Sequence, residues 1–121
     1  MRAHLVAAVF TGEKTATSSL HQSYLEEDEP LPEPGLYRLV DATDETAGVV
    51  EVTDVEVRRV ADVDDEIAQA EGEGFASADA WRRGHQAYWG ATGEAPDGLH
   101  DDLLVVVERF HLRPDLSTPP A

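Results

Sequence analysis

The sequence predicts an α+β fold in which helices pack around a small sheet. Segments with apolar residues at helical spacing are interspersed with segments of strand-like alternation, in the order helix, strand, strand, helix, helix, strand. With 121 residues, 41% of them apolar, the chain can build one core. No linker divides it, so we expect a single domain over residues 1–121 and a sheet that partly closes into a barrel.

The first part of the chain predicts a helix that ends just before a polar segment. Residues 3–11 place apolar side chains on one helical face, and Gly12 suits the position after a helix end. From Lys14 to Leu20 the Ser and Thr side chains favour an extended or turn conformation. The proline-rich residues 30–35 must end any helix that precedes them.

Two strands follow, and together they predict a hairpin. Residues 36–40 are largely apolar, and residues 49–60 alternate valines with polar side chains. The alternation breaks at Asp54, which predicts a bulge or a bend. Residues 41–48 between the strands predict a turn, so we expect the two strands to pair.

The second half predicts two helices and the central strand. Residues 62–70 are helix-prone, and Ser77 is suited to cap a longer helix. Gly84 lies inside that longer helix, which marks close packing or a kink. Residues 103–112 form the most apolar strand, which we expect to be central and covered on both faces, and residues 115–121 form a loose tail. The longer helix also has an aromatic face, formed by Trp81, His85, Tyr88 and Trp89.

The composition is strongly acidic, with 25 Asp and Glu against 9 Lys and Arg and a formal net charge of −16. Such a charge repels phosphate backbones, which disfavours a long duplex-DNA surface and leaves a nucleoside or a short RNA strand as a ligand. The chain has no cysteine, which rules out disulfides, thiolate zinc sites and cysteine nucleophiles. Because no apolar run could span a bilayer and no signal peptide is present, we expect a cytoplasmic protein without a membrane partner.

Lys14 is the only lysine, and it lies among the hydroxyl side chains of residues 12–19. An ammonium is a compact charge that can lose its proton when it is buried, whereas arginine stays charged. Lys14 and Thr17, three residues later, are therefore the leading candidates for chemistry. Two other interpretations stay open: codon bias or salt adaptation removed the other lysines, or Lys14 neutralises the end of the preceding helix.

Few other residues suggest a site. Phosphate-loop, dinucleotide-binding, nucleophile-elbow and zinc-protease motifs are absent. The 5 histidines lack the spacing of a zinc site, so we expect no metal and no cofactor, although carboxylates could hold magnesium. Glu73 lies between Gly72 and Gly74, whose flexible backbone can bring a carboxylate into a cleft, or it is a solvated residue after a helix. The aromatic face is core or, less commonly, a surface that stacks a base.

Several segments together resemble the ASCH domain family, whose fold is similar to the PUA domain of RNA-modifying enzymes. Residues 12–17 resemble the family's Gly-x-Lys-x-Thr-x signature, and further segments agree in order and spacing. These are residues 32–35, residues 70–74 followed by 81–85, and residues 108–110. The resemblance implies a PUA-like small mixed β-barrel with flanking helices and a cleft beside Lys14.

The resemblance also implies a role around RNA. Some small bacterial relatives are amidohydrolases that remove the acetyl group from N4-acetylcytidine, with catalytic residues that fall on Lys14, Thr17 and Glu73. In this hypothesis Thr17 attacks the amide or positions a water molecule, and Lys14 acts as base and then as acid. Glu73 orients Lys14 or protonates the leaving amine. Backbone N–H groups of residues 15–18 stabilise the oxyanion. We expect further substrate contacts from Thr15, Ser18, Arg82 and His85.

Two alternatives to the hydrolase hypothesis stay open. A non-catalytic RNA-binding module would bind in a salt-dependent way through its paired arginines, which are Arg58, Arg59, Arg82 and Arg83. Other relatives are reported as ribonucleases, but no histidine pair is placed here for phosphodiester chemistry. Relatives of this type also usually carry an additional segment before the first helix. Two interpretations stay open: a missing segment leaves the cleft more open, or the start of this chain was chosen differently.

Overall fold

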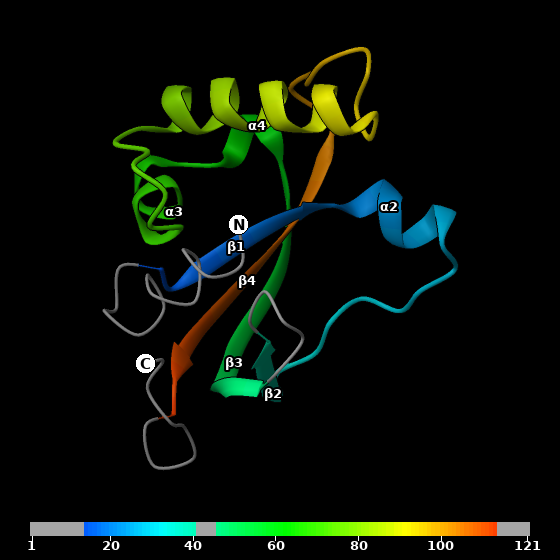
Figure 1. Ribbon diagram of the computed structural model, residues 1–121. Helices are drawn as coiled ribbons and strands as arrows, with labels where there is room; N and C mark the ends of the chain where they lie inside the picture. Colours follow the sequence, from blue (N-terminus) through cyan, green and yellow to red (C-terminus); the bar gives the residue numbers. More distant parts are fainter. Residues whose placement is uncertain (1–13, 41–45, 114–121) are drawn as a thin grey trace.

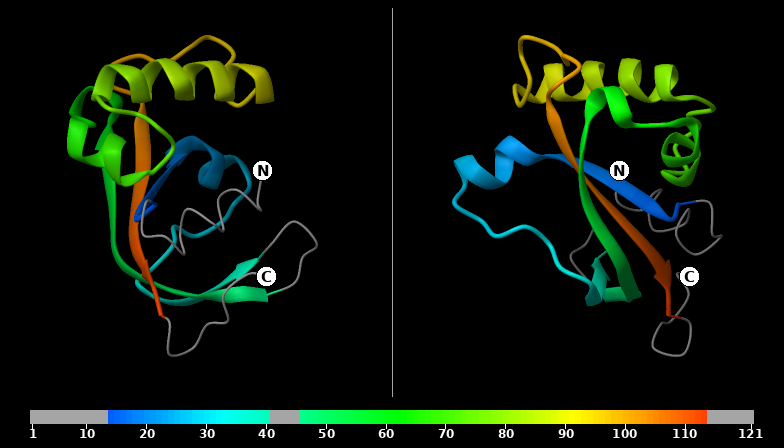
Figure 2. Two further views of the ribbon diagram at one scale, coloured as in Figure 1. Left: turned by 60° about the vertical axis from the view of Figure 1, so that its left-hand side comes forward. Right: turned by 180° about the vertical axis from the view of Figure 1, so that it is seen from behind.

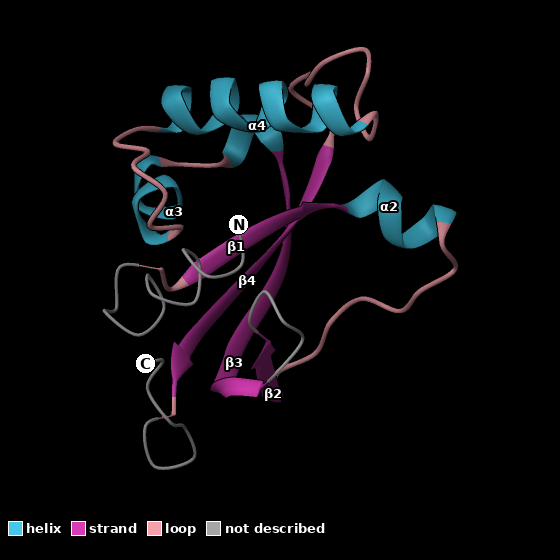
Figure 3. Cartoon of the chain, viewed as in Figure 1, coloured by secondary structure: helices cyan, strands magenta, loops and turns pink. Residues whose placement is uncertain are grey.

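The computed structural model describes residues 14–40 and 46–113. Its elements are β1 (Ala16–Leu20), α2 (His21–Glu26), β2 (Gly35–Val40), β3 (Thr46–Arg59), a 3-10 helix (Val60–Asp62), α3 (Asp65–Ala70), α4 (Ala78–Thr92) and β4 (Leu104–Leu112). Helices α3 and α4 lie together at one end of the sheet, and α2 continues from the far end of β1 (Figures 1 and 3). The α+β class is confirmed. The helix predicted at 3–11 and the tail predicted at 115–121 lie outside the described residues.

The described strands form one antiparallel sheet in the order β1-β4-β3-β2. β4 is an interior strand, as predicted, and three successive residues, Val105, Val106 and Val107, are fully buried, so both faces are covered there. β2 and β3 form the predicted hairpin, and a register shift between Val52 and Asp54 confirms the predicted irregularity. The long strand β3 curves strongly (Figure 2). Because the described strands form an open sheet, closure into a barrel stays a prediction.

The main core fills the space between α3, α4 and one face of the sheet. The sheet contributes Leu20 from β1 and Val105 and Val107 from β4. The helices contribute Ile67 and Trp81, which are also completely buried. Burial of this apolar surface holds α3 and α4 against the sheet. The turn after α3 therefore lies beside the residues that lead into β1.

Helix α4 begins at the predicted cap, because Oγ of Ser77 accepts a hydrogen bond from the N–H of Ala80. Its residues Trp81, His85 and Trp89 are buried, so the aromatic face belongs to the core. The prediction that Tyr88 shares this face is wrong, since Tyr88 is 58% exposed. At about 100° per residue, position 88 lies about 60° from the centre of the buried stripe, on the side that faces solvent.

Helix α2 was not predicted from the sequence. It has six residues, none of them buried, and no side chain caps its start. Two contacts hold it: Oη of Tyr24 lies 2.8 Å from Oγ of Ser19, and Nε2 of Gln22 donates to the carbonyl oxygen of Glu94. So short a helix depends on tertiary contacts, which leave no local pattern in the sequence. In the described ranges, no helix is long and apolar enough to cross a bilayer.

Gly84 marks close packing rather than a kink. A Cβ atom at this position would lie 2.5 Å from Cε1 and 2.7 Å from Cζ of Phe75, whereas one at Gly90 would meet nothing within 4 Å. We expect Gly84→Ala to lower the free energy of unfolding by about 1–3 kcal/mol, despite the higher helix propensity of alanine. The matched Gly90→Ala should raise it by roughly 0.5–1 kcal/mol. Urea unfolding measures both changes, and shifts of the same sign would contradict the packing role of Gly84.

Candidate functional site

Lys14 lies in the segment that leads into β1, and only 7% of the residue is exposed. Its Nζ donates a hydrogen bond to the carbonyl oxygen of Glu71 at 3.1 Å and lies 3.7 Å from Oε2 of Glu73. A buried ammonium needs such partners, because its separation from water is otherwise costly. The structure thus brings Lys14 and Glu73 together at the end of α3.

The turn after α3 carries Glu73 to this position. Gly72 has φ of +65° and Gly74 has φ of +88°, both in the left-handed region that glycine adopts without strain. These two residues reverse the chain directly after the helix, so Glu71 points to the interior while Glu73 lies beside Lys14. The side chain of Glu73 is 36% exposed, so the ion pair is open to solvent on that side.

The carboxylate of Glu71 is almost completely buried, with 1% of the residue exposed. Its Oε2 accepts hydrogen bonds from Oγ of Ser18, at 2.7 Å, and from Nε1 of Trp81, and its Oε1 lies 3.2 Å from Nε2 of His85. Burial alone would raise the pKa of Glu71. The hydrogen bond and charge of His85 and the hydrogen bonds from Ser18 and Trp81 lower this pKa by more than burial raises it. They hold the pKa of Glu71 below its ordinary value, so Glu71 is ionised near neutral pH.

Glu71 was not predicted from the sequence. The glycines on either side drew attention to Glu73, while Glu71 looked like another acid in a polar segment. One signal could have found it: Glu71 follows Ile67 by four residues, so both lie on the same helical face. Ile67 is completely buried and Glu71 is 1% exposed, as that spacing predicts. An acid on a buried face needs hydrogen-bond donors from other elements, which the sequence pattern does not show.

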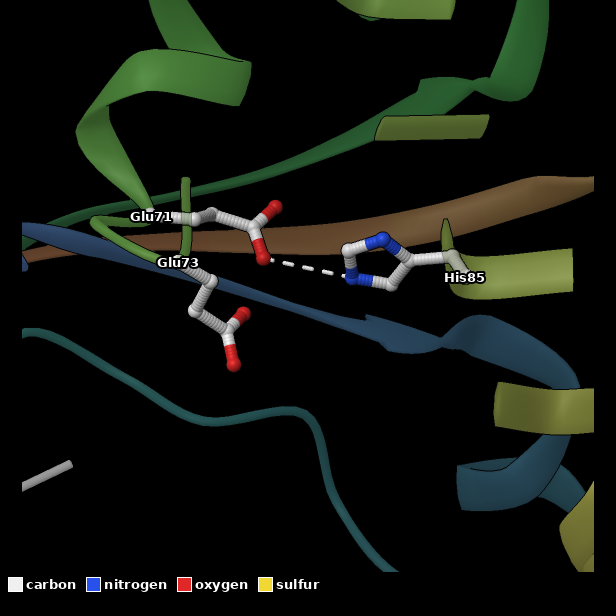
Figure 4. A group of neighbouring side chains, drawn as sticks. All are labelled: Glu71, Glu73 and His85. Atoms are coloured by element: carbon white, nitrogen blue, oxygen red, sulfur yellow. Dashed lines mark ion pairs between the residues drawn. The ribbon is translucent and has the colours of Figure 1, made fainter. Parts of the chain in front are cut away.

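His85 completes this buried network. Its Nδ1 lies 3.0 Å from the carbonyl oxygen of Trp81, and its ring stacks on that of Trp81 with centroids 4.4 Å apart. The ring of Trp89 is 4.7 Å away between centroids. A carbonyl oxygen and an ionised carboxylate both accept, so each ring nitrogen of His85 faces an acceptor. Figure 4 shows His85 and Glu71 pointing toward each other.

Glu71, Glu73 and His85 also form a group with the chemistry of metal ligands. Their ligand atoms lie within 4.8 Å of one another, an arrangement that the spacing of the histidines did not predict (Figure 4). The existing contacts argue against a resident cation, because Glu71 engages His85 and the ammonium of Lys14 lies beside Glu73. A metal would have to break the contact between His85 and Glu71 and remain next to the charge of Lys14.

Thr15 and Arg82, which we expected to contact a substrate, have partners within the protein. The N–H of Thr15 donates to the carbonyl oxygen of Ala70 at 2.7 Å, so it is not available to stabilise an oxyanion. Arg82 donates to Oδ1 of Asp101 at 2.7 Å and to the carbonyl oxygen of Leu99 at 3.1 Å. The contact of Thr15 joins the residue before β1 to α3. The contacts of Arg82 join α4 to the segment before β4.

Thr17 lies on the opposite face of β1 from Ser18, because successive side chains of a strand alternate between faces. Ser18 points to the helices and to the buried network. Ser19 points the other way, where its Oγ meets Oη of Tyr24 at 2.8 Å. Thr17 shares the face of Ser19, and no hydrogen bond joins its hydroxyl to any described residue. The contacts of Lys14 are with Glu71 and Glu73, and a role of Thr17 beside Lys14 stays a prediction.

The arginines expected to bind RNA are each paired with a carboxylate. The shortest N···O distances are 2.8 Å for Arg58–Glu56, 3.0 Å for Arg59–Asp62, 2.7 Å for Arg82–Asp101 and 3.1 Å for Arg83–Asp79. A phosphate backbone would have to compete with these acids, since phosphate binding depends on unneutralised positive charge. The pairs therefore favour a small ligand over a long polyanion.

The chain resembles known proteins in both sequence and fold. A family model described as ASCH domain matches residues 1–113. The crystal structure of an ASCH domain from Lactobacillus crispatus is similar, with a TM-score of 0.78 and 26% identity over 91% of this chain and 70% of that chain. A crystal structure of a protein from Enterococcus faecalis has a TM-score of 0.77 and 28% identity over 91% of this chain and 67% of that one. No curated protein matches the chain with significance.

Proposed function

The chain belongs to the ASCH domain family, and from this membership we propose that it acts on RNA-related ligands by hydrolysing an amide on a modified nucleoside such as N4-acetylcytidine. The observation that supports this proposal is the burial of the Lys14 ammonium 3.7 Å from the carboxylate of Glu73. A group that transfers protons must lie within hydrogen-bond reach of its partners or of one bridging water. The exposed side of Glu73 offers a ligand access to the pair.

In the proposed reaction Lys14 transfers a proton twice. As a free amine it takes a proton from a water molecule, whose oxygen adds to the carbonyl carbon of the acetyl group. As an ammonium it then gives a proton to the exocyclic nitrogen while the C–N bond breaks, which releases acetic acid and cytidine. Glu73 holds the amine in position and stabilises the ammonium between the two steps. We assign the attack to water because Thr17 lies on the opposite face of β1 from Ser18.

The charge of the protein supports a nucleoside as the substrate rather than an RNA strand. The formal net charge is −16, and an uncharged nucleoside does not oppose that field. The pairing of the arginines with carboxylates also favours a nucleoside, because it leaves less positive charge for a phosphate backbone. A non-catalytic RNA-binding module would need unpaired positive charge along a groove, so we rank it below hydrolysis.

Glu73→Gln should reduce turnover without unfolding the protein. The amide keeps the size of the side chain but loses the charge that faces Lys14, so we expect acetate release from N4-acetylcytidine to slow by about 100-fold. Chromatographic separation of N4-acetylcytidine from cytidine measures the rate. Glu26→Gln is the matched control, because Glu26 is an exposed residue of α2. Wild-type protein without turnover would refute the proposal, and cleavage of single-stranded RNA instead would favour the ribonuclease alternative.

A further inference from the structure

Glu71 has contacts at both its side chain and its backbone, and both lead to the segment that carries Lys14. Its carboxylate accepts a hydrogen bond from Oγ of Ser18 at 2.7 Å, and its carbonyl oxygen accepts one from Nζ of Lys14 at 3.1 Å. Ser18 and Lys14 belong to the same stretch of chain, which leads into β1 and continues along it. Glu71 therefore holds this stretch at two points, and the two contacts form a closed ring with the backbone between them.

The carboxylate of Glu71 also ties the turn after α3 to helix α4. Nε1 of Trp81 donates to its Oε2, and Nε2 of His85 lies 3.2 Å from its Oε1. Within residues 14–40 and 46–113, no buried side-chain nitrogen or oxygen lacks a hydrogen-bond partner, so the buried polar atoms of this cluster are all engaged. A fully satisfied buried cluster is rigid, because any member that moves loses a bond that water does not replace.

The backbone of the turn has little other support. The N–H of Gly72 still donates to a carbonyl oxygen of α3, at 3.1 Å, but no backbone hydrogen bond among the described residues holds Glu73 or Gly74. The two glycines add conformational freedom to the turn. The buried carboxylate of Glu71 is thus the fixed point nearest to both oxygens that face the Lys14 amine, which are its own carbonyl oxygen and Oε2 of Glu73.

We propose that Glu71 is a positioning residue, whose buried carboxylate holds the turn so that the Lys14 amine keeps a single orientation. Because protein donors occupy this carboxylate, Glu71 acts through Lys14 and Glu73 rather than on a ligand. Ser18 supports it from β1. The positioning can be tested without a substrate, whereas its consequence for turnover rests on the proposed hydrolysis.

The nuclear magnetic resonance spectrum of Lys14 tests the positioning directly. Because Lys14 is the only lysine, protein that carries isotope-labelled lysine gives one set of lysine side-chain signals. A held side chain gives its two Hε protons different chemical shifts, whereas rapid exchange between rotamers averages them. We expect two separate Hε shifts in the wild type and one averaged shift in Glu71→Gln, because the amide nitrogen donates where the carboxylate accepted.

Turnover of N4-acetylcytidine gives a second measurement. Loss of orientation affects the reacting complex more than substrate binding, so Glu71→Gln should lower the maximal rate by about 10-fold to 100-fold with nearly unchanged apparent affinity. Ser18→Ala keeps the charge of Glu71 and removes one donor. It should lower the maximal rate and the separation of the Hε shifts in the same direction but by less, and it decides alone where Glu71→Gln fails to fold.

Leu99→Ala is the control for a merely structural effect. Leu99 is buried in the main core and lies in the segment before β4, so this variant should unfold at a lower temperature. It should nevertheless keep the two Hε shifts of the wild type. Unchanged Hε shifts in Glu71→Gln and Ser18→Ala would overturn the proposal, as would averaged shifts in Leu99→Ala or in the wild type. These spectra need no turnover, so they decide the role of Glu71 even if N4-acetylcytidine is not hydrolysed.

Discussion

Lys14→Met is expected to reduce the hydrolysis of N4-acetylcytidine by about 100-fold to 10,000-fold, the range found when a positioned acid or base is removed. Methionine fills the space of the lysine side chain but can neither accept nor give a proton. The loss should appear in the maximal rate more than in the apparent affinity, because Lys14 acts on the reacting atoms. Chromatographic rates at saturating and low substrate separate the two.

Lys14→Arg distinguishes proton transfer from charge. Arginine keeps the positive charge beside Glu73 but stays protonated at any relevant pH, so this variant should be nearly as inactive as Lys14→Met. Thermal unfolding of both variants shows whether the fold survives the change. If Lys14→Arg hydrolysed the substrate at the wild-type rate, positive charge alone would be sufficient and the proton-transfer role would be wrong.

Glu71→Ala should have the largest effect on stability. Its removal leaves Oγ of Ser18, Nε1 of Trp81 and the ring of His85 without their acceptor inside the protein. Loss of one partner of a buried pair typically costs about 3–5 kcal/mol, because the remaining charge and donors stay desolvated. Urea unfolding, followed by the fluorescence of Trp81 and Trp89, measures the change.

Glu66→Ala is the matched control for Glu71→Ala. Glu66 also accepts from a cation, with 2.7 Å between Oε1 and Nη2 of Arg109, but its side chain is 65% exposed. Exposed pairs contribute little, so we expect a loss of at most about 1 kcal/mol. Equal losses for the two variants would contradict the role of burial in the Glu71 network.

The Glu71 network also predicts a specific dependence on pH. The pKa of Glu71 is held below its ordinary value of 4.5, so ionised Glu71 stabilises the fold above that pH. The contribution is lost as the pH falls through the lower pKa of the folded state. Glu71→Gln removes this titration, so the stability difference between the wild type and the variant should shrink on acidification. A difference that stays constant below pH 4.5 would show that Glu71 is not the group involved.

Much of the fold could be predicted because its patterns are local. The alternating valines of β3, the apolar run of β4 and the cap at Ser77 each reflect a rule that a few neighbouring residues satisfy. Helix α2 escaped prediction because contacts with distant residues hold it. Tyr88 was placed wrongly because helical spacing defines the centre of a buried face better than its edge.

The candidate site was predictable only in part. Lys14 and Glu73 stood out because one is the only lysine and the other is flanked by glycines that reverse the chain. Glu71 could not be recognised in the same way, since its role arises where side chains of β1 and α4 converge. The face of β1 on which Thr17 lies likewise follows from strand alternation, which requires knowing that β1 begins at Ala16.

Chemical rescue of Lys14→Ala tests most directly whether the buried amine of Lys14 transfers protons. The shortened side chain leaves space beside Glu73 for a small primary amine such as ethylamine. We predict that acetate release from N4-acetylcytidine, lost in Lys14→Ala, returns in proportion to the concentration of unprotonated ethylamine. A wild-type rate for Lys14→Ala without any added amine would contradict the mechanism.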